Sequence, residues 1–258
     1  MNAVAVERLK TQMQELDFDF LPGQLETLLH EESQKDRPLV ETLISMFDVE
    51  LTQKRQRAAK MRLKLSRIPQ VKLLDELDLS DVEGISQKQL NELKTLSFID
   101  RKENVILMGS SGLAKTHIML GLCHNACMAG YTAYFLSCIE LVEMLIRAKQ
   151  SRRLKNKLKA LCKPHLLAID EVGYQQLTQE ESQLFFQLVS ERYEKGSIIL
   201  TTNKSFGQWA ELMGEQAVAT ATLDRLLHHS HVFILKGESY RLKNRIKNGL
   251  VPRAFDNE

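Results

Sequence analysis

From residue 87 to residue 235, the chain alternates between short apolar runs and longer segments in which apolar residues recur every three or four positions. A short apolar run is typical of a buried strand, and the longer period is typical of an amphipathic helix. Strands are therefore predicted at residues 105–108, 132–136, 166–169, 197–202 and 232–235. Helices are predicted at residues 87–97, 116–129, 139–160, 178–193, 206–213 and 217–227. This alternation predicts an α/β fold, a three-layer sandwich around a five-stranded parallel sheet.

The N-terminal part of the chain has helical patterns and no strand signal. Its second long segment carries an apolar stripe over residues 39–51, which is followed by the basic stretch 54–67. We expect such a helix to pack at its apolar end and to contact an anion at its cationic end. The acidic, turn-rich residues 73–86 are expected to form a linker. The prediction is an all-α N-terminal module over residues 1–75 and an α/β domain over residues 76–258.

The sequence VILMGSSGLAKT at residues 105–116 has the pattern of a phosphate-binding P-loop. An apolar strand enters a loop whose backbone N–H groups can surround phosphate oxygens, and a helix begins directly after the loop. Lys115 is expected to reach the β- and γ-phosphates of ATP, and the Thr116 hydroxyl is expected to bind Mg²⁺. The residues predicted to bind ATP are Gly109, Ser110, Ser111, Gly112, Leu113, Ala114, Lys115 and Thr116.

Ala114 departs from this pattern, because the P-loop consensus has glycine directly before the lysine. Its methyl group is expected to point into space where the backbone must approach the phosphates closely. We therefore expect a lower affinity for nucleotide than with glycine, while the predicted fold is unaffected. An ordinary strand–turn–helix is the alternative interpretation of this segment.

Polar residues at the ends of two later strands predict the rest of an ATPase site. One apolar strand ends in Asp170 and Glu171, which is a Walker B pattern. Asp170 is expected to hold Mg²⁺, and Glu171 is expected to polarise the attacking water. Asn203 follows the next strand and is expected to lie between the γ-phosphate and that water. Arg225 precedes the last strand and is expected to act as an arginine finger in a neighbouring subunit's site; a surface arginine paired with Asp224 is the alternative.

The charged residues are strongly segregated, although the formal net charge is only +2. Two runs of Lys and Arg contain no acid, one between Glu50 and Asp75 and one between Glu143 and Asp170, and a third run covers residues 241–253. Clustered cations gain free energy by displacing the counterions of a polyanion, and these runs lack the aromatic residues of single-strand binders. Duplex DNA is the predicted partner, although a solvated helix face is the alternative for any one run. The predicted DNA contacts are Lys54, Arg55, Arg57, Lys60, Arg62, Lys64, Arg152, Arg153, Lys155 and Lys157.

Three further features narrow the class of protein. No apolar run reaches the ~18 residues that span a bilayer and the N-terminus does not resemble a signal peptide, so we expect a cytoplasmic protein without membrane contact. The four cysteines lack C-x-x-C spacing and are predicted to be reduced. His228, His229 and His231 lack helical i, i+4 spacing, and no carboxylate or cysteine accompanies them in the sequence. We therefore expect them at an interface or a strand edge rather than in a metal site.

Five segments, in this order and spacing, resemble the IstB-like transposition helper ATPases, which are AAA+ proteins related to the bacterial helicase loaders: GSSGLAKTH, LLAIDEVGY, FFQLVSERYEKGSIILTTN, LDRLLHHSH and GESYRLKN. The resemblance covers nearly the whole chain and implies an AAA+ P-loop ATPase that uses ATP and Mg²⁺ and is encoded by an insertion sequence. It also implies a homo-oligomer, as a ring or a helical assembly, that deforms double-stranded DNA, marks the target, and recruits and stimulates its partner transposase. The residues that take the nucleotide roles by position are Lys115, Thr116, Asp170, Glu171, Asn203 and Arg225.

Two alternatives remain open at this point. A replicative helicase loader would share the fold, but its N-terminal module would bind a helicase instead of a transposase. A nucleotide-blind DNA scaffold would result if Ala114 disables the nucleotide pocket.

Overall fold

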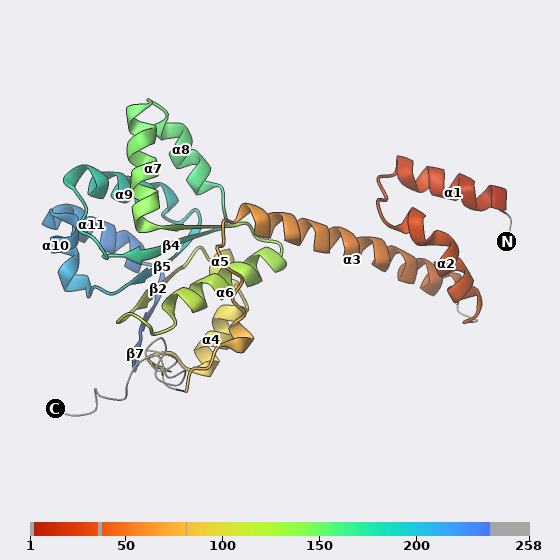
Figure 1. The fold of residues 1–258 in the computed structure, drawn as a ribbon, viewed down its shortest axis with the longest axis horizontal. Coiled ribbons are helices and arrows are strands. Elements are labelled where there is room, and N and C mark those ends of the chain that lie inside the picture. The colour runs from red at the N-terminus through yellow and green to blue at the C-terminus, as the bar shows by residue number, and fades with distance from the viewer. Residues whose placement is uncertain (1–2, 36–37, 81, 238–258) are drawn as a thin grey trace, which may run out of the picture. The chain divides into compact units, whose positions relative to one another are not determined.

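The computed structural model describes residues 3–35, 38–80 and 82–237 (Figure 1). The chain divides into two compact units, Met1–Met61 and Arg62–Glu258. This division falls within a long helix, on the N-terminal side of the predicted boundary between residues 75 and 76. The basic run over residues 241–253 lies outside the described residues.

The N-terminal unit is helical, as the sequence predicts. Helix α1 spans Ala3–Glu15, α2 spans Leu21–Ser33, and α3 spans Leu39–Leu65 and continues into the second unit. Pro22 lies in the first turn of α2, where the missing N–H of proline costs no helical hydrogen bond. A small apolar core holds the three helices together and consists of Val6, Met13, Leu21, Leu25 and Met46.

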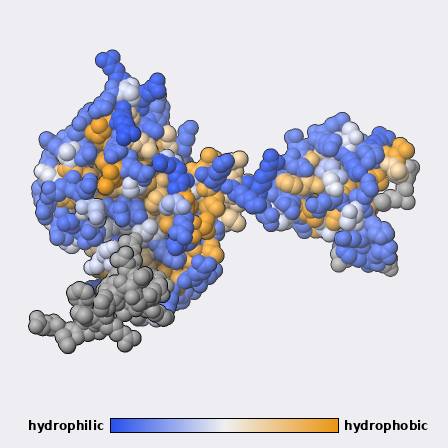
Figure 2. Space-filling view, viewed as in Figure 1, coloured by the Kyte–Doolittle hydropathy of each residue, from blue (hydrophilic) through white to orange (hydrophobic). Residues whose placement is uncertain are grey.

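The apolar stripe of α3 is largely exposed in this unit, although this end of the helix does pack against α1 and α2 through Met46. Between residues 39 and 51, only Met46 and Glu50 are buried, because α1 and α2 cover one face of the helix. Apolar surface, coloured orange, is visible on this unit in Figure 2. The exposed members of the stripe are Leu39, Val40, Leu43, Ile44, Phe47 and Leu51.

Glu50 is the buried polar centre of the N-terminal unit, with only 3% of its surface exposed. Its carboxylate accepts hydrogen bonds from the backbone N–H groups of Asp19 (2.7 Å), Phe20 (2.8 Å) and Leu21 (2.7 Å). It therefore caps the N-terminus of α2, whose own N-cap residue Phe20 forms no side-chain cap. Burial raises the pKa of Glu50, but the three N–H groups and Lys54 outweigh burial and hold the pKa below its ordinary value.

We expect Glu50→Gln to loosen the N-terminal unit, because the neutral amide satisfies fewer of these N–H groups. The expected cost is about 2 kcal/mol, or roughly a thirtyfold loss of hydrogen-exchange protection at the start of α2 in the full chain. A carboxyl group whose pKa is lowered by folding stabilises the fold above its unfolded-state pKa, and the stabilisation is lost as the pH falls through the folded-state pKa. The difference between the two proteins should therefore disappear in acid. Glu41→Gln, at an exposed position of the same helix, is the control; equal protection in both variants would contradict the capping role.

The second unit is built around a five-stranded parallel sheet, which confirms the predicted topology class. The strand order is β3-β4-β5-β2-β6. The strands are β2 (Asn104–Met108), β3 (Ala133–Ser137), β4 (Leu166–Val172), β5 (Ser197–Thr202) and β6 (Ser230–Ile234). Two short strands, β1 (Val82–Glu83) and β7 (Lys236–Gly237), pair antiparallel in a separate ribbon. The carboxyl ends of β2, β4 and β5 meet at one edge of the main sheet.

Helices cover both faces of this sheet, so the predicted three-layer sandwich is confirmed (Figure 1). One face packs against α4 (Gln87–Lys94), α5 (Ser97–Asp100) and α6 (Lys115–Met128). The other packs against α7 (Cys138–Gln150), α8 (Leu154–Cys162), α9 (Gln179–Arg192), α10 (Trp209–Met213) and α11 (Gln216–Leu227). Successive residues of β2 alternate between the two cores, with Ile106 in one and Val105 and Leu107 in the other. None of the helices in the described ranges is long and apolar enough to cross a membrane.

The predicted helix over residues 139–160 is interrupted, which is a correction to the sequence-based assignment. Helix α7 ends at Gln150, and Arg152 adopts a left-handed conformation with φ of 56°. The N–H of Arg152 donates to the Lys149 carbonyl (3.0 Å) and the N–H of Arg153 donates to the Ala148 carbonyl (2.7 Å). These two bonds form a Schellman motif, which ends a helix. Glycine usually occupies this left-handed position, so the arginine there hides the helix end in the sequence.

We expected residues 73–86 to form a linker, but this segment packs into the second unit, which is called the sheet unit below. Leu74, in the short 3₁₀ helix η1 (Leu74–Glu76), and Ile85 both belong to the apolar core. Leu74 lies against Gly121 of α6, where an added Cβ would come within 2.5 Å of the leucine side chain. Glycine at position 121 therefore permits the close approach of η1 to α6.

A second 3₁₀ turn, η2, spans Phe206–Gln208 and lies directly before α10.

The four cysteines are free thiols. Cys123, Cys127 and Cys138 are buried and Cys162 is half-buried. Burial raises the pKa of all four thiols, that of Cys138 to about 12. They are therefore packing residues of the sheet unit.

Candidate functional site

The predicted P-loop is present as a strand–loop–helix at the carboxyl edge of the sheet. Strand β2 ends at Met108, and α6 begins at Lys115. The loop starts at Gly109, whose φ of 151° and lack of a side chain let it approach the Leu235 carbonyl; an added Cβ would lie 2.4 Å from that oxygen. The Lys115 ammonium donates to the carbonyl oxygens of Gly109 and Ser110, each at 2.7 Å. These contacts hold the lysine over the loop.

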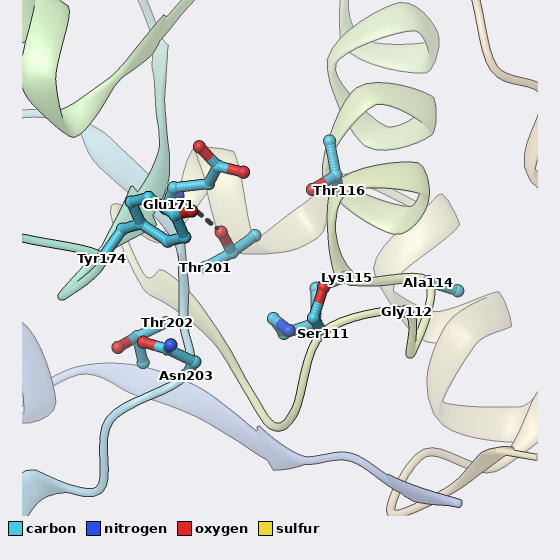
Figure 3. Close-up of a pocket in the computed structure, with 10 residues that line it drawn as sticks. All are labelled: Ser111, Gly112, Ala114, Lys115, Thr116, Glu171, Tyr174, Thr201, Thr202 and Asn203. Carbon is cyan, nitrogen blue, oxygen red and sulfur yellow. Dashed lines mark hydrogen bonds between the residues drawn. The ribbon is translucent and has the colours of Figure 1, made fainter. Parts of the chain in front are cut away.

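Ala114 is the residue immediately before α6 and adopts a left-handed conformation with φ of 56°. Figure 3 shows its methyl group directed away from Lys115, Thr201 and Asn203, the side chains around the cavity. The expected crowding of the phosphate path by this methyl group is therefore not supported by the geometry. The cost of alanine here is instead one of backbone conformation, because a Cβ disfavours the left-handed region by roughly 1 kcal/mol or more.

The two residues predicted to bind Mg²⁺, Thr116 and Asp170, are in direct contact. The Thr116 hydroxyl lies 3.1 Å from both carboxylate oxygens of Asp170. Asp170 is only 6% exposed and lies near the end of β4. A hydroxyl and a carboxylate at the mouth of a phosphate loop are the oxygen donors that Mg²⁺ prefers, so this pair fits the ion.

Thr201 joins the two acids of the Walker B pattern, and sequence reasoning did not identify it. Its hydroxyl donates to Asp170 Oδ1 (2.5 Å) and accepts a hydrogen bond from the backbone N–H of Glu171 (2.9 Å). Glu171 has a left-handed φ of 61°, and the pairing of β4 with β5 shifts in register between Ile169 and Val172. This irregularity turns the Glu171 side chain toward the P-loop (Figure 3). The only signal in the sequence is a hydroxyl residue near the end of the strand beside the Walker B strand.

One cavity of about 400 Å³ opens at the carboxyl edge of the sheet, between the P-loop and the ends of β4 and β5. Asn203, just after β5, lies across the cavity from the P-loop (Figure 3). Tyr174, which is 70% exposed, contributes an aromatic side chain. The lining consists of Ser111, Gly112, Ala114, Lys115, Thr116, Glu171, Tyr174, Thr201, Thr202 and Asn203. The structure thus brings together most of the residues predicted to bind the phosphates, the metal and the attacking water. The predicted residues that do not line the cavity are Gly109, Ser110, Leu113 and Asp170, of which Asp170 contacts Thr116.

Arg225 does not line this cavity. Its guanidinium lies 4.7 Å from the centre of the Phe186 ring and donates to the Ala221 carbonyl (3.2 Å). With Tyr193, Glu194 and other residues it lines a small separate cavity. An arginine finger acts on the nucleotide of a neighbouring subunit, so this position agrees with that role without testing it.

Some of the cations predicted to contact DNA form contacts within the chain, and others do not. Lys54 pairs with Glu50 (3.4 Å), Arg57 pairs with Asp19 (3.1 Å), and the Arg62 guanidinium donates to the Cys127 carbonyl (2.9 Å). The others are exposed or half-buried and form no ion pair within the described ranges. They are Arg55, Lys60, Lys64, Arg152, Arg153, Lys155 and Lys157.

A P-loop, a buried Walker B strand and a polar strand end in a parallel sheet of order β3-β4-β5-β2-β6 define an ATP-binding domain of the AAA+ type. The family "IstB-like ATP binding protein" matches residues 11–248, and the chain belongs to this family. The fold alone is shared with a DnaI crystal structure (TM-score 0.53, 18% identity, covering 67% of this chain and 92% of DnaI). It is also shared with AMPPCP-bound DnaA from Aquifex aeolicus (TM-score 0.52, 17% identity, covering 71% of this chain and 57% of that one).

Two relatives from insertion sequences share much of the chain. An insertion sequence IS21 ATP-binding protein from Pseudomonas aeruginosa is 40% identical over 248 residues, which cover 96% of this chain and 94% of the relative. An insertion sequence IS5376 ATP-binding protein from Geobacillus stearothermophilus is 43% identical over 205 residues, which cover 80% and 82%. These similarities confirm the resemblance to IstB-like proteins that the motifs indicated.

Proposed function

We propose that this chain is an ATP-dependent, DNA-binding regulator of transposition. In this proposal it binds ATP, oligomerises on duplex DNA, selects or remodels the target, and recruits and stimulates a partner transposase. One observation carries the ATPase part: Thr116, Asp170, Glu171 and Thr201 form a connected group facing the P-loop. The insertion-sequence origin of the relatives supports the part that concerns transposition.

Several residues in and around the cavity have a role in the proposed reaction. The loop N–H groups and Lys115 bind the phosphates, and Thr116 and Asp170 would hold Mg²⁺, which supplies charge neutralisation when bound. Glu171 orients the attacking water and accepts its proton, and Asn203 contacts that water and the γ-phosphate. Arg225 of a neighbouring copy would complete the site, so the proposed reaction takes place in an oligomer.

Thr201→Val is expected to lower kcat for ATP hydrolysis about tenfold and to change KM for ATP much less, because the lost hydroxyl positions the Glu171 backbone and Asp170 and lies on β5, outside the phosphate loop. Valine has nearly the same volume as threonine, so the packing of β5 is preserved. Steady-state ATPase kinetics measure both constants. Thr201→Ser keeps the hydroxyl and should restore kcat; a serine variant as slow as the valine variant would show that packing, and not the hydrogen bonds, matters.

The proposed function as a whole is tested by nucleotide-dependent assembly on duplex DNA. Analytical ultracentrifugation with ATP, ADP or no nucleotide should show a large DNA-bound species with ATP. A pull-down with the partner transposase and, separately, with the host's replicative helicase distinguishes the regulator from a helicase loader. Assembly on DNA to the same extent with ATP, with ADP and without nucleotide would contradict the proposal. A pull-down that retains the helicase and not the transposase would also contradict it.

A further inference from the structure

Three metal-ligating side chains from distant parts of the sequence meet at the amino end of the sheet, opposite the nucleotide cavity. They are Glu194, His228 and His229. Glu194 lies in the turn between α9 and β5, and the two histidines lie between α11 and β6. Strands β5 and β6 flank β2 and run parallel to it, so the turns that precede them lie at the same edge. No carboxylate is close to these histidines in the sequence, but the fold places the carboxylate of Glu194 beside them.

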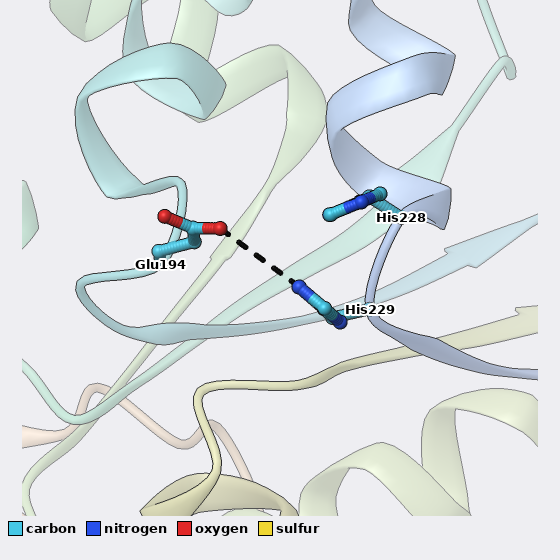
Figure 4. Close-up of side chains that lie close together, drawn as sticks. All are labelled: Glu194, His228 and His229. Carbon is cyan, nitrogen blue, oxygen red and sulfur yellow. Dashed lines mark ion pairs between the residues drawn. The ribbon is translucent and has the colours of Figure 1, made fainter.

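We propose that this cluster binds a Zn²⁺ ion. One ligand atom from each residue can be chosen so that all lie within 4.8 Å of one another, and His229 Nε2 lies 3.8 Å from Glu194 Oε1. In a tetrahedral site with bonds of about 2.1 Å, two ligand atoms on one zinc ion lie about 3.4 Å apart. Figure 4 shows Glu194 and His229 facing each other, with His228 beside them. Small rotations of these exposed side chains would therefore bring all three into ligand range.

The types of ligand favour zinc over magnesium. Two imidazoles and one carboxylate are the protein ligands of open zinc sites, in which water takes the fourth position. Magnesium prefers oxygen ligands in a strict octahedron and would not compete well for two histidines. This cluster is therefore chemically distinct from the Thr116–Asp170 pair, which offers oxygen alone.

Tyr193 prepares one of the histidines for metal binding. The Tyr193 hydroxyl lies 2.7 Å from His228 Nδ1. When Nδ1 carries the proton and donates it to the tyrosine oxygen, Nε2 keeps its lone pair free for a metal. The backbone of the cluster is also fixed, because the Asn104 N–H donates to the His229 carbonyl (2.8 Å) and the His228 N–H donates to the Asp224 carbonyl (3.1 Å).

Nearby positive charge limits the affinity. Lys102 and Arg225 line the small cavity that Glu194 and His229 also line, and they repel a cation. We therefore expect weaker binding than in a closed site with four protein ligands. A bound ion would connect the end of α9 to the end of α11, one helical turn beyond Arg225.

Calorimetric titration of the full chain, without an affinity tag, with Zn²⁺ and separately with Mg²⁺ tests the proposal. One Zn²⁺ per chain is expected at this cluster, with no matching Mg²⁺ signal. His228→Ala and Glu194→Ala should each weaken zinc binding by more than tenfold, and Tyr193→Phe by roughly tenfold. His231→Ala is the matched control, because His231 is not one of the three clustered ligands and its Nε2 already lies 2.8 Å from Glu103.

Three outcomes would overturn the proposal: no zinc binding by the intact chain, undiminished binding in His228→Ala, or binding lost in His231→Ala as fully as in Glu194→Ala. Circular dichroism of each variant identifies any that fails to fold. In that case the zinc affinity of Tyr193→Phe, which removes only one oxygen, tests the proposal. ATP affinity should stay unchanged in all of them, so failure here is separable from failure of the proposed ATPase.

Discussion

Glu171→Gln is expected to bind ATP with little change in affinity and to hydrolyse it at least about a hundredfold more slowly. The amide keeps the shape of the side chain and leaves Thr116 and Asp170 intact, but it cannot accept a proton from water. ATP should therefore hold the assembly on DNA for longer than in the unmodified chain. ATP turnover and filter-binding lifetimes on duplex DNA measure the two effects, and Glu211→Gln on the surface of α10 is the control for loss of one acid.

Lys115→Ala should differ from Glu171→Gln by weakening ATP binding itself, because the ammonium is the side-chain charge placed over the phosphate loop. Calorimetric titration separates the two variants. If Glu171→Gln abolishes nucleotide-dependent assembly as completely as Lys115→Ala does, the assigned division of roles is wrong. If the unmodified chain binds no ATP, the nucleotide-blind scaffold becomes the better interpretation, with the left-handed Ala114 as its physical cause.

Arg153→Gln/Lys157→Gln is expected to flatten the salt dependence of duplex binding. Both side chains line a groove of about 480 Å³ with Arg67 and Arg147, which are themselves paired with acids. Each phosphate contact contributes a slope of about 0.9 in log K against log salt, so losing two should reduce the slope by up to about 1.8. Fluorescence anisotropy at several salt concentrations measures this slope on two unrelated sequences, which should behave alike. Arg55→Gln/Lys60→Gln is the corresponding test for the N-terminal run.

The control for these pairs removes equal charge elsewhere on the sheet unit, with Lys88→Gln/Lys195→Gln. This control should leave the slope almost unchanged if the slope depends on contacts between individual cations and phosphates and not on the net charge of the chain. ATP affinity should be unchanged in every pair. An unaltered slope together with lost stimulation of the transposase would instead make the altered run a docking surface for protein.

The sheet and the nucleotide cavity were predictable because each strand carries a short apolar run, and the runs of β2, β4 and β5 lead into the P-loop, the two acids and Asn203. Parallel strands place those ends at one edge, so Lys115, Asp170 and Asn203 had to meet there once the topology was assigned. The motifs shared with IstB-like proteins assign the same residues to the nucleotide site. The strand bounds differ from the predicted ones by only a few residues, as at β4, which extends through the acids to Val172.

Other features were hidden because they depend on backbone conformation or on distant contacts. Arg152 ends α7 in a left-handed conformation without a glycine to indicate it. Glu194 reaches the histidines only through the fold, and Thr201 connects two acids on the neighbouring strand. The exposed stripe on α3 has a helical pattern in the sequence, but periodicity alone does not say whether a partner element covers it.

The burial of the native thiols has a practical consequence for following this protein in solution. Their raised pKa values leave little thiolate at neutral pH, so maleimide reagents should react with them slowly. A single cysteine introduced at an exposed position, such as Lys88 of α4, should therefore take a fluorophore selectively without removal of the native cysteines. Energy transfer between labelled copies would then report association of chains on DNA in real time.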